Sequence, residues 1–189
     1  MTDQPSTGPV YASLKGQRAL VIGGSRGIGR AISLRLAQEG AHVVATYVRA
    51  EDSALATVND CQALGVDARA IKADVGDPDA LRDLFAQLED WTPGGGAPGL
   101  DILINNAARG LERPRPATEQ RHGHLHRTMD VNLFGPWGAI QAAAPLMDSR
   151  GGGAIVNLLS PGADHYMPDY AAVGVSKAAL TSLTMYLAT

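Results

Sequence analysis

The architecture follows from residues 18–29, which read RALVIGGSRGIG. A short apolar run over residues 18–23 enters a glycine-rich turn, and a helical pattern of apolar residues follows over residues 27–39. Such a run is typical of a strand buried on both faces, and the glycines let the chain turn sharply after it. The helix N-terminus offers free N–H groups and a partial positive charge, so the turn is suited to bind phosphate. The alternative is a tight strand-to-helix connection without a ligand.

Strand and helix patterns alternate along the rest of the chain. Such alternation is typical of βαβ units, so we expect an α/β fold, a Rossmann-like doubly wound parallel sheet with helices on both faces. Residues 109–123 are rich in Arg, Pro and His and are expected to form a surface loop. Further strands are expected at residues 42–47, 66–71, 100–104 and 154–158, and helices at 52–64, 78–90, 124–148 and from 170 to the end.

Composition limits the class of protein. The 189 residues are 45% hydrophobic and 19% charged, with a formal net charge of -3, which argues against a nucleic-acid-coating surface. The single cysteine, Cys61, suits a reducing compartment. We find no apolar run of the ~20 residues that a membrane helix needs and no signal-peptide pattern, so we expect a cytoplasmic protein without membrane contact. Residues 1–13 are expected to be a flexible arm and residues 14–189 a dinucleotide-binding domain.

The residues after the second expected strand bear on the choice of dinucleotide. An acidic residue there would bind a ribose 2′-hydroxyl and select NAD. This chain has Arg49 instead, and Arg26 lies in the glycine-rich turn. Two guanidinium groups can neutralise a 2′-phosphate, so we expect NADPH as the cofactor. The alternative is a pair of ordinary surface arginines.

Four motifs, in order and spacing, resemble the short-chain dehydrogenase/reductase superfamily from about residue 14 to the end. They are the Gly23-x-x-x-Gly27-x-Gly29 turn, Asn105-Asn106-Ala107, Asn132, and Ser160 followed by Ser176-Lys177-Ala178-Ala179-Leu180. The resemblance implies catalytic roles for Tyr170, Lys177, Ser160 and Asn132. It implies a cofactor site made of Gly23, Ser25, Arg26, Gly27, Ile28, Gly29, Arg49, Asp74, Val75, Asn106, Ala107 and Lys177.

One departure from the family pattern narrows the activity. The family usually places a tyrosine four residues before the lysine, where this chain has Val173, and Tyr170 lies seven residues before Lys177. This Tyr-x6-Lys spacing is similar to that of the NADPH-dependent bacterial enoyl-acyl-carrier-protein reductases. The resemblance implies hydride transfer to the C=C bond of a 2-enoyl thioester. Two alternatives stay open: a 3-oxoacyl or carbonyl reductase in which Ser160 and Tyr170 polarise a ketone, and a non-catalytic NADP-binding partner subunit.

Helix geometry makes the longer spacing intelligible. Each helical residue turns by ~100° and rises by ~1.5 Å, so positions four or seven apart both return near one face. The family resemblance implies that Lys177 holds the nicotinamide ribose, and the longer spacing then lets Tyr170 reach a thioester oxygen one turn further along. Tyr170 could instead be a partly buried aromatic at a helix start, and Tyr166 could line an acyl pocket or simply pack. Asn132 could hold a water near the lysine or cap a local kink in its helix.

The family resemblance also bears on partners and extent. It implies an acyl thioester substrate, which an acyl carrier protein can present, and a homo-oligomer; no metal is expected, and His122, His124 and His126 are read as a solvated patch. Residues 113–116 are expected as an ordered loop over the pocket mouth. The family continues beyond residue 189, so we expect a C-terminally truncated chain that lacks the last strands, exposes the fifth strand as an edge and has little activity alone.

Overall fold

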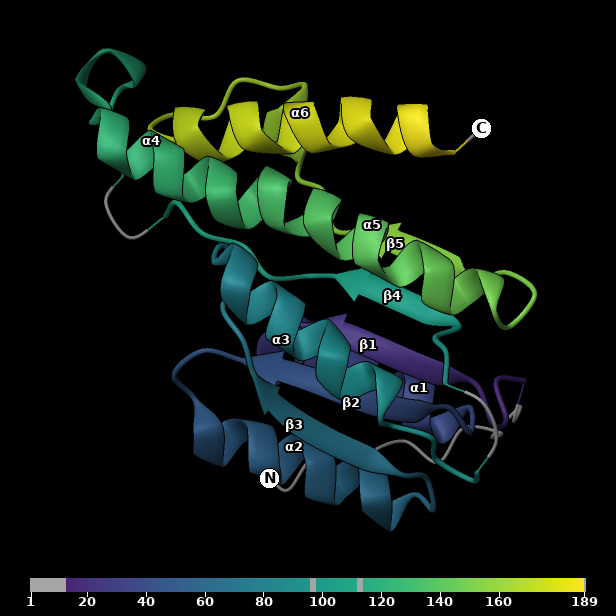
Figure 1. Ribbon diagram of the computed structural model, residues 1–189. Coiled ribbons are helices and arrows are strands. Elements are labelled where there is room, and N and C mark those ends of the chain that lie inside the picture. Colours follow the sequence, from purple (N-terminus) through teal and green to yellow (C-terminus); the bar gives the residue numbers. More distant parts are fainter. Residues whose placement is uncertain (1–12, 96–97, 112–113, 189) are drawn as a thin grey trace.

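A parallel five-stranded sheet forms the centre of the computed structural model, which describes residues 13–95, 98–111 and 114–188 (Figure 1). Its strands run in the order β3-β2-β1-β4-β5, and every neighbouring pair is parallel. Their bounds are β1 (Arg18–Ile22), β2 (His42–Tyr47), β3 (Ala68–Lys72), β4 (Ile102–Asn105) and β5 (Ala154–Asn157). The predicted doubly wound Rossmann-like sheet is confirmed. The strand order reverses between β1 and β4, where such sheets open a crevice at their carboxyl ends.

Helices cover both faces of this sheet. Alternate β1 side chains point to opposite faces, so Leu20 packs in a core with α3 and α5, and Val21 packs in a second core with α1 and α2. The helices are α1 (Gly27–Gln38), α2 (Glu51–Ala63), α3 (Pro78–Glu89), α4 (His122–Met129), α5 (Gly135–Asp148) and α6 (Ala171–Leu187). Short helical turns occur at η1 (Ala117–Glu119), η2 (Asp130–Phe134) and η3 (Pro161–Ala163). Helix α6 lies along α4 and η2, and Leu180 and Leu183 pack there against Leu133.

The sequence-based bounds are close to those observed, with three differences. The third strand begins at Ala68 rather than residue 66, and the fourth at Ile102 rather than residue 100. The Asp101 carboxylate accepts a hydrogen bond from the Arg18 backbone N–H at 2.7 Å, so this residue anchors the strand from outside it. The expected long helix begins at His122 inside the predicted loop, and a π-helical turn at η2 interrupts it.

The outer edge of the sheet is open in the described part of the chain. Strand β5 pairs only with β4 there, and its Ile155 and Val156 are 38% and 47% exposed. The prediction of an exposed fifth strand is confirmed. Among the described helices, none combines the length and apolar character needed to span a membrane. Residues 1–12 of the predicted arm lie outside the described residues.

Candidate functional site

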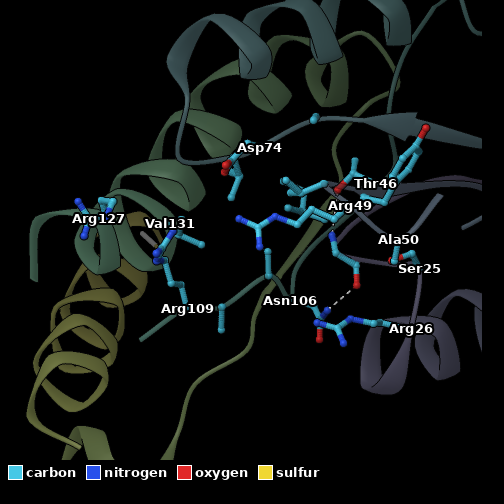
Figure 2. A pocket seen from close by; sticks show the side chains of 18 of the residues that line it. Ser25, Arg26, Thr46, Arg49, Ala50, Asp74, Asn106, Arg109, Arg127 and Val131 are labelled. Carbon is cyan, nitrogen blue, oxygen red and sulfur yellow. Dashed lines mark hydrogen bonds between the residues drawn. The ribbon is translucent and has the colours of Figure 1, made fainter. Parts of the chain in front are cut away.

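The glycine-rich turn after β1 is held in place by polar side chains from two neighbouring strands. The Gly23 backbone N–H donates to Thr46 Oγ1 at 2.9 Å, and Asn106 Nδ2 donates to the Gly23 carbonyl at 2.8 Å (Figure 2). Gly23 has a φ of +76°, a left-handed conformation that favours glycine. The turn is therefore fixed from both sides, with the N-terminus of α1 beside it.

Close packing explains the last glycine of the turn. A Cβ on Gly29 would overlap the Gly23 carbonyl oxygen and would lie 2.6 Å from Asn106 Nδ2. The first turn of α1 thus touches the backbone of the glycine-rich turn. Gly29 therefore contacts the turn through its close approach to Gly23, and it is not among the residues that line the neighbouring cavity.

A cavity of about 1220 Å³ opens at the carboxyl ends of the strands. It fits a dinucleotide, because it is large, it joins the glycine-rich turn to the ends of β2, β3 and β4, and it carries basic side chains. The structure brings together ten of the twelve predicted cofactor residues in its lining; Gly29 and Lys177 are not among the lining residues. The ten are Gly23, Ser25, Arg26, Gly27, Ile28, Arg49, Asp74, Val75, Asn106 and Ala107.

Two hydroxyl groups meet at the end of β5. Ser160 Oγ and Tyr170 Oη lie 2.9 Å apart, within hydrogen-bond distance. Ser160 precedes η3 and Tyr170 precedes α6, so the two residues come from opposite ends of one connecting segment. A Cβ on Gly162 would lie 2.5 Å from Tyr170 Cδ1, so this glycine lets the ring approach the segment. The pair presents two hydroxyls that one carbonyl oxygen could accept from.

Lys177 lies on the next turns of α6 and is buried, with 3% of its surface exposed. Its Nζ donates to the Leu158 carbonyl at 2.6 Å. Within the described residues this is its one hydrogen-bond partner, so two N–H groups of the ammonium remain for a ligand. Burial lowers the pKa of Lys177 from its ordinary value of 10.5.

This lowered pKa predicts a pH dependence of stability. The folded state binds the Lys177 proton more weakly than the unfolded state, so the charged form destabilises the fold in full below the folded pKa. The penalty disappears as the pH rises toward 10.5. We expect the free energy of unfolding of the wild type to increase relative to that of Lys177→Met between neutral pH and pH 10.5. Urea titrations of both proteins measure this, and a pH-independent difference would contradict it.

Val173 occupies the position where the family usually has tyrosine. It is buried, with 4% of its surface exposed, and a Cβ on Gly110 would lie 2.7 Å from Val173 Cγ2. The Val173 side chain therefore packs closely against Gly110, in the segment after β4. Among the tyrosines that precede Lys177 in the sequence, Tyr170 is the nearest.

Asn132 joins three segments around this site. Its Oδ1 accepts from the Arg109 N–H at 2.8 Å, and its Nδ2 donates to the Arg109 carbonyl and to Ser176 Oγ, both at 2.9 Å. The residue lies inside the π-helical turn and is fully buried. Both of its N–H groups are thus used within the protein, and the geometry fits the kink alternative. Its catalytic role stays a prediction.

Removing this amide tests its structural contribution. Asn132→Ala breaks three hydrogen bonds and is expected to lower the free energy of unfolding by about 2–4 kcal/mol. Ser176→Ala removes one of the three contacts, together with the 2.8 Å hydrogen bond that Ser176 Oγ donates to the Val173 carbonyl, and serves as the comparison, with an expected loss of about 1–2 kcal/mol. Urea unfolding measures both. Equal losses in the two variants would contradict a three-way joint at Asn132.

A second cavity of about 580 Å³ lies beside the hydroxyl pair. Tyr170 lines it, as do Tyr166 and Met167 from the same connection, and Pro116, Ala117 and Thr118 form another part of its wall. The lining is largely apolar, which suits an acyl group. Tyr166 is 91% exposed, so it does not pack in the core, and its predicted place in the wall of an acyl pocket stays a prediction.

Several residues of the large cavity were not identified from the sequence. Thr46 is the clearest, and a polar residue within the apolar run of β2 was the available signal. Figure 2 shows Arg109, Arg127 and Val131 grouped on the α4 side, across from Arg26. The remaining lining residues from the predicted loop and α4 are far from the glycine-rich turn in the sequence, and only the folded structure brings them to the cavity.

The three histidines of the predicted solvated patch do not share one environment. His124 is buried, with Nε2 3.3 Å from the Gly110 carbonyl, whereas His122 and His126 are exposed.

Comparisons with known proteins agree with this geometry. The family model for short chain dehydrogenase matches residues 17–189. The 3-oxoacyl-[acyl-carrier-protein] reductase FabG of Staphylococcus aureus is 38% identical over 173 residues, which are 87% of this chain and 68% of that protein. The 3beta-hydroxysteroid dehydrogenase 1 of Eggerthella lenta is 34% identical over 181 residues, 95% of this chain and 66% of that protein.

Solved structures show the same fold. A short chain dehydrogenase from Burkholderia cenocepacia J2315, in complex with NADP, matches with a TM-score of 0.82 and 38% identity. A blue fluorescent protein from a metagenomic library, in complex with NADPH, matches with a TM-score of 0.82 and 37% identity. Each match covers 93% of this chain and 69% of the other.

Proposed function

The chain belongs to the short chain dehydrogenase family, and from this premise we propose that it is an NADPH-dependent reductase of the 3-oxo group of an acyl thioester. The observation that carries the proposal is the 2.9 Å approach of Ser160 Oγ to Tyr170 Oη. A carbonyl oxygen placed between the two hydroxyls can accept from both. The name of the Staphylococcus aureus relative, a 3-oxoacyl-[acyl-carrier-protein] reductase, supports the same substrate class.

This proposal reverses the order of the two sequence-based hypotheses. The Tyr-x6-Lys spacing favoured a 2-enoyl thioester, and the 3-oxoacyl substrate was the alternative. The relatives that resemble the chain support the alternative better. Reduction of an enoyl thioester remains the second candidate, because Val173 is buried at the family's usual tyrosine position and Tyr170 stands further from Lys177 along the helix.

The proposed roles follow from the chain's own donors. NADPH, when bound, supplies the hydride. Tyr170 Oη and Ser160 Oγ would donate to the carbonyl oxygen, and their hydrogen bonds strengthen as negative charge develops there. Tyr170 would then pass its proton to that oxygen. Lys177, buried and held by the Leu158 carbonyl, would direct its remaining N–H groups to the ribose hydroxyls.

Cofactor selection would rest on Arg26 and Arg49 at the rim of the large cavity. Both are exposed, and neither forms an ion pair within the described residues, so both can bind a 2′-phosphate. We expect Arg49→Ala to lower the preference for NADPH over NADH by about tenfold, the factor given by about 1.4 kcal/mol. The ratio of kcat/KM for the two cofactors measures this. An unchanged ratio in Arg49→Ala and in the Arg26→Ala, Arg49→Ala double variant would contradict it.

Ser160 separates the two candidate substrates. Ser160→Ala removes one of two donors to a ketone oxygen and is expected to lower kcat on a 3-oxobutanoyl thioester by about 10²-fold. With a 2-butenoyl thioester, whose oxygen lies away from the hydride-accepting carbon, the serine is in a supporting position and kcat should change little. NADPH absorbance measures both rates. Loss of activity only with the enoyl substrate would contradict the proposal.

Partner binding remains part of the proposal. The name of the relative FabG specifies a substrate on an acyl carrier protein. We propose the same kind of substrate here, with the thioester carried by a pantetheine group. Phe134 and Trp137 on the η2–α5 segment and Val175 on α6 are exposed apolar side chains, which supports the expected homo-oligomer.

A further inference from the structure

The large cavity is strongly basic. Among its lining residues six are arginines and one, Asp74, is acidic; the arginines are Arg26, Arg49, Arg109, Arg115, Arg121 and Arg127. Elsewhere in the chain arginines pair with carboxylates, as Arg30 does with Asp60 at 2.6 Å and Arg82 with Asp79 at 2.8 Å. Within the described residues, Arg115, Arg121 and Arg127 form no such pair. Uncompensated positive charge in a cleft attracts anions.

These arginines belong to two walls. Arg26 and Arg49 follow β1 and β2 and are the arginines that the proposed function assigns to the 2′-phosphate of the dinucleotide. Arg115 and Arg121 flank η1, and Arg127 lies on α4, near Val131 (Figure 2). The second wall therefore carries positive charge for which the 2′-phosphate does not account.

The segment around η1 separates the two cavities. Arg115 and Arg121 line the large cavity, and the residues between them, Pro116, Ala117 and Thr118, line the small cavity with Tyr170. Gln120 Nε2 donates to the Arg115 carbonyl at 2.9 Å, which closes the segment into a compact turn. Glu119, the one acidic residue between the two arginines, lines neither cavity. A thioester whose carbonyl lies at Tyr170 can thus extend its tail over η1 toward the arginines.

We propose that Arg115 and Arg121, with Arg127 in the lining of the same cavity, bind the phosphate of a phosphopantetheine thioester. The inference rests on the proposed function, because it places the thioester carbonyl at Tyr170. Guanidinium groups bind phosphate oxygens through paired, charge-assisted hydrogen bonds. The same phosphate occurs in coenzyme A and on carrier proteins, so the site recognises the chemistry that both share.

A matched pair of substrates tests the site: 3-oxobutanoyl pantetheine and 3-oxobutanoyl 4′-phosphopantetheine, which differ only in the phosphate. We expect the wild type to show a KM about tenfold lower for the phosphorylated substrate, with similar kcat. The Arg115→Gln, Arg121→Gln double variant should lose this difference and keep its KM for the unphosphorylated substrate. Arg82→Gln, which removes one positive charge from α3 outside both cavities, should retain the difference.

Further measurements separate the explanations. The same loss of preference with the coenzyme A thioester and with the carrier-protein thioester supports the shared phosphate, whereas a loss confined to coenzyme A assigns the arginines to its nucleotide and overturns the proposal. A weaker affinity of the double variant for NADPH, measured by fluorescence, assigns them to the dinucleotide and also overturns it.

The site can be tested without turnover. If no thioester is reduced, the proposed function fails, and calorimetric titration with 4′-phosphopantetheine and with pantetheine still decides the inference. Preferential binding of the phosphorylated compound by the wild type, lost in the double variant and retained in Arg82→Gln, supports the site. Equal binding of both compounds overturns it.

Discussion

Tyr170→Phe is expected to lower kcat on a 3-oxobutanoyl thioester by about 10²–10⁴-fold, the range over which a positioned general acid contributes. The substitution removes one oxygen and keeps the ring that packs against Gly162. Ser160 Oγ loses its 2.9 Å partner but remains bonded to the Gly162 N–H, so the segment should stay folded. NADPH absorbance at saturating substrate measures the effect.

Tyr186→Phe is the matched control for this prediction. Tyr186 lies near the far end of α6 and is 79% exposed, so the same loss of a hydroxyl there should leave kcat within about twofold. Thermal unfolding of both variants checks that the fold is retained. If Tyr170→Phe keeps more than half of the wild-type kcat, the hydroxyl pair does not perform the chemistry.

Gly29→Ala is expected to abolish NADPH binding and to lower the free energy of unfolding by about 3 kcal/mol. The added Cβ would overlap the Gly23 carbonyl and approach Asn106 Nδ2 to 2.6 Å, so α1 must separate from the turn that it supports. The separation disrupts the Asn106–Gly23 hydrogen bond and displaces the N–H groups that would bind phosphate. Urea unfolding and NADPH fluorescence measure the two effects.

Gly65→Ala distinguishes this packing effect from the general consequence of replacing a glycine. Gly65 has a φ of +88°, but no atom lies within 4 Å of the added Cβ. We expect a loss of about 1–2 kcal/mol from backbone strain and unchanged NADPH binding. Normal NADPH affinity in Gly29→Ala would contradict the role assigned to the turn.

The sequence was sufficient to predict the elements that depend on residues close together in the chain. The apolar run of β1, the glycine-rich turn and the start of α1 lie within residues 18–29, so pattern and conformational preference identify them together. The same applies to the start of α3, which the sequence places at Pro78. The structure confirms this start and adds Asp77 as the N-cap residue. Ten of the predicted cofactor residues line one cavity because they follow neighbouring parallel strands, whose carboxyl ends meet at one edge.

Tertiary contacts determine what the sequence left open. The π-helical turn at Asn132 depends on hydrogen bonds to Arg109, 23 residues away, and to Ser176, 44 residues away. The arginines at positions 115, 121 and 127 are six residues apart, but they lie in a loop, at the start of α4 and on α4, so no pattern of a single helix or strand predicts that they line one cavity. The spacing of Tyr170 and Lys177 is compatible with either substrate, and the position of Ser160 beside Tyr170 became evident only in the structure.

The central claim is that Ser160 and Tyr170 together activate a ketone beside the bound dinucleotide. A competition assay tests it most directly: equimolar 3-oxobutanoyl and 2-butenoyl thioesters are incubated with the protein and limiting NADPH, and the products are resolved by mass spectrometry. We predict that the 3-hydroxybutanoyl thioester is the main product. A predominance of the saturated butanoyl thioester would contradict the claim and establish the enoyl substrate, and bound NADPH without either product would indicate a non-catalytic subunit.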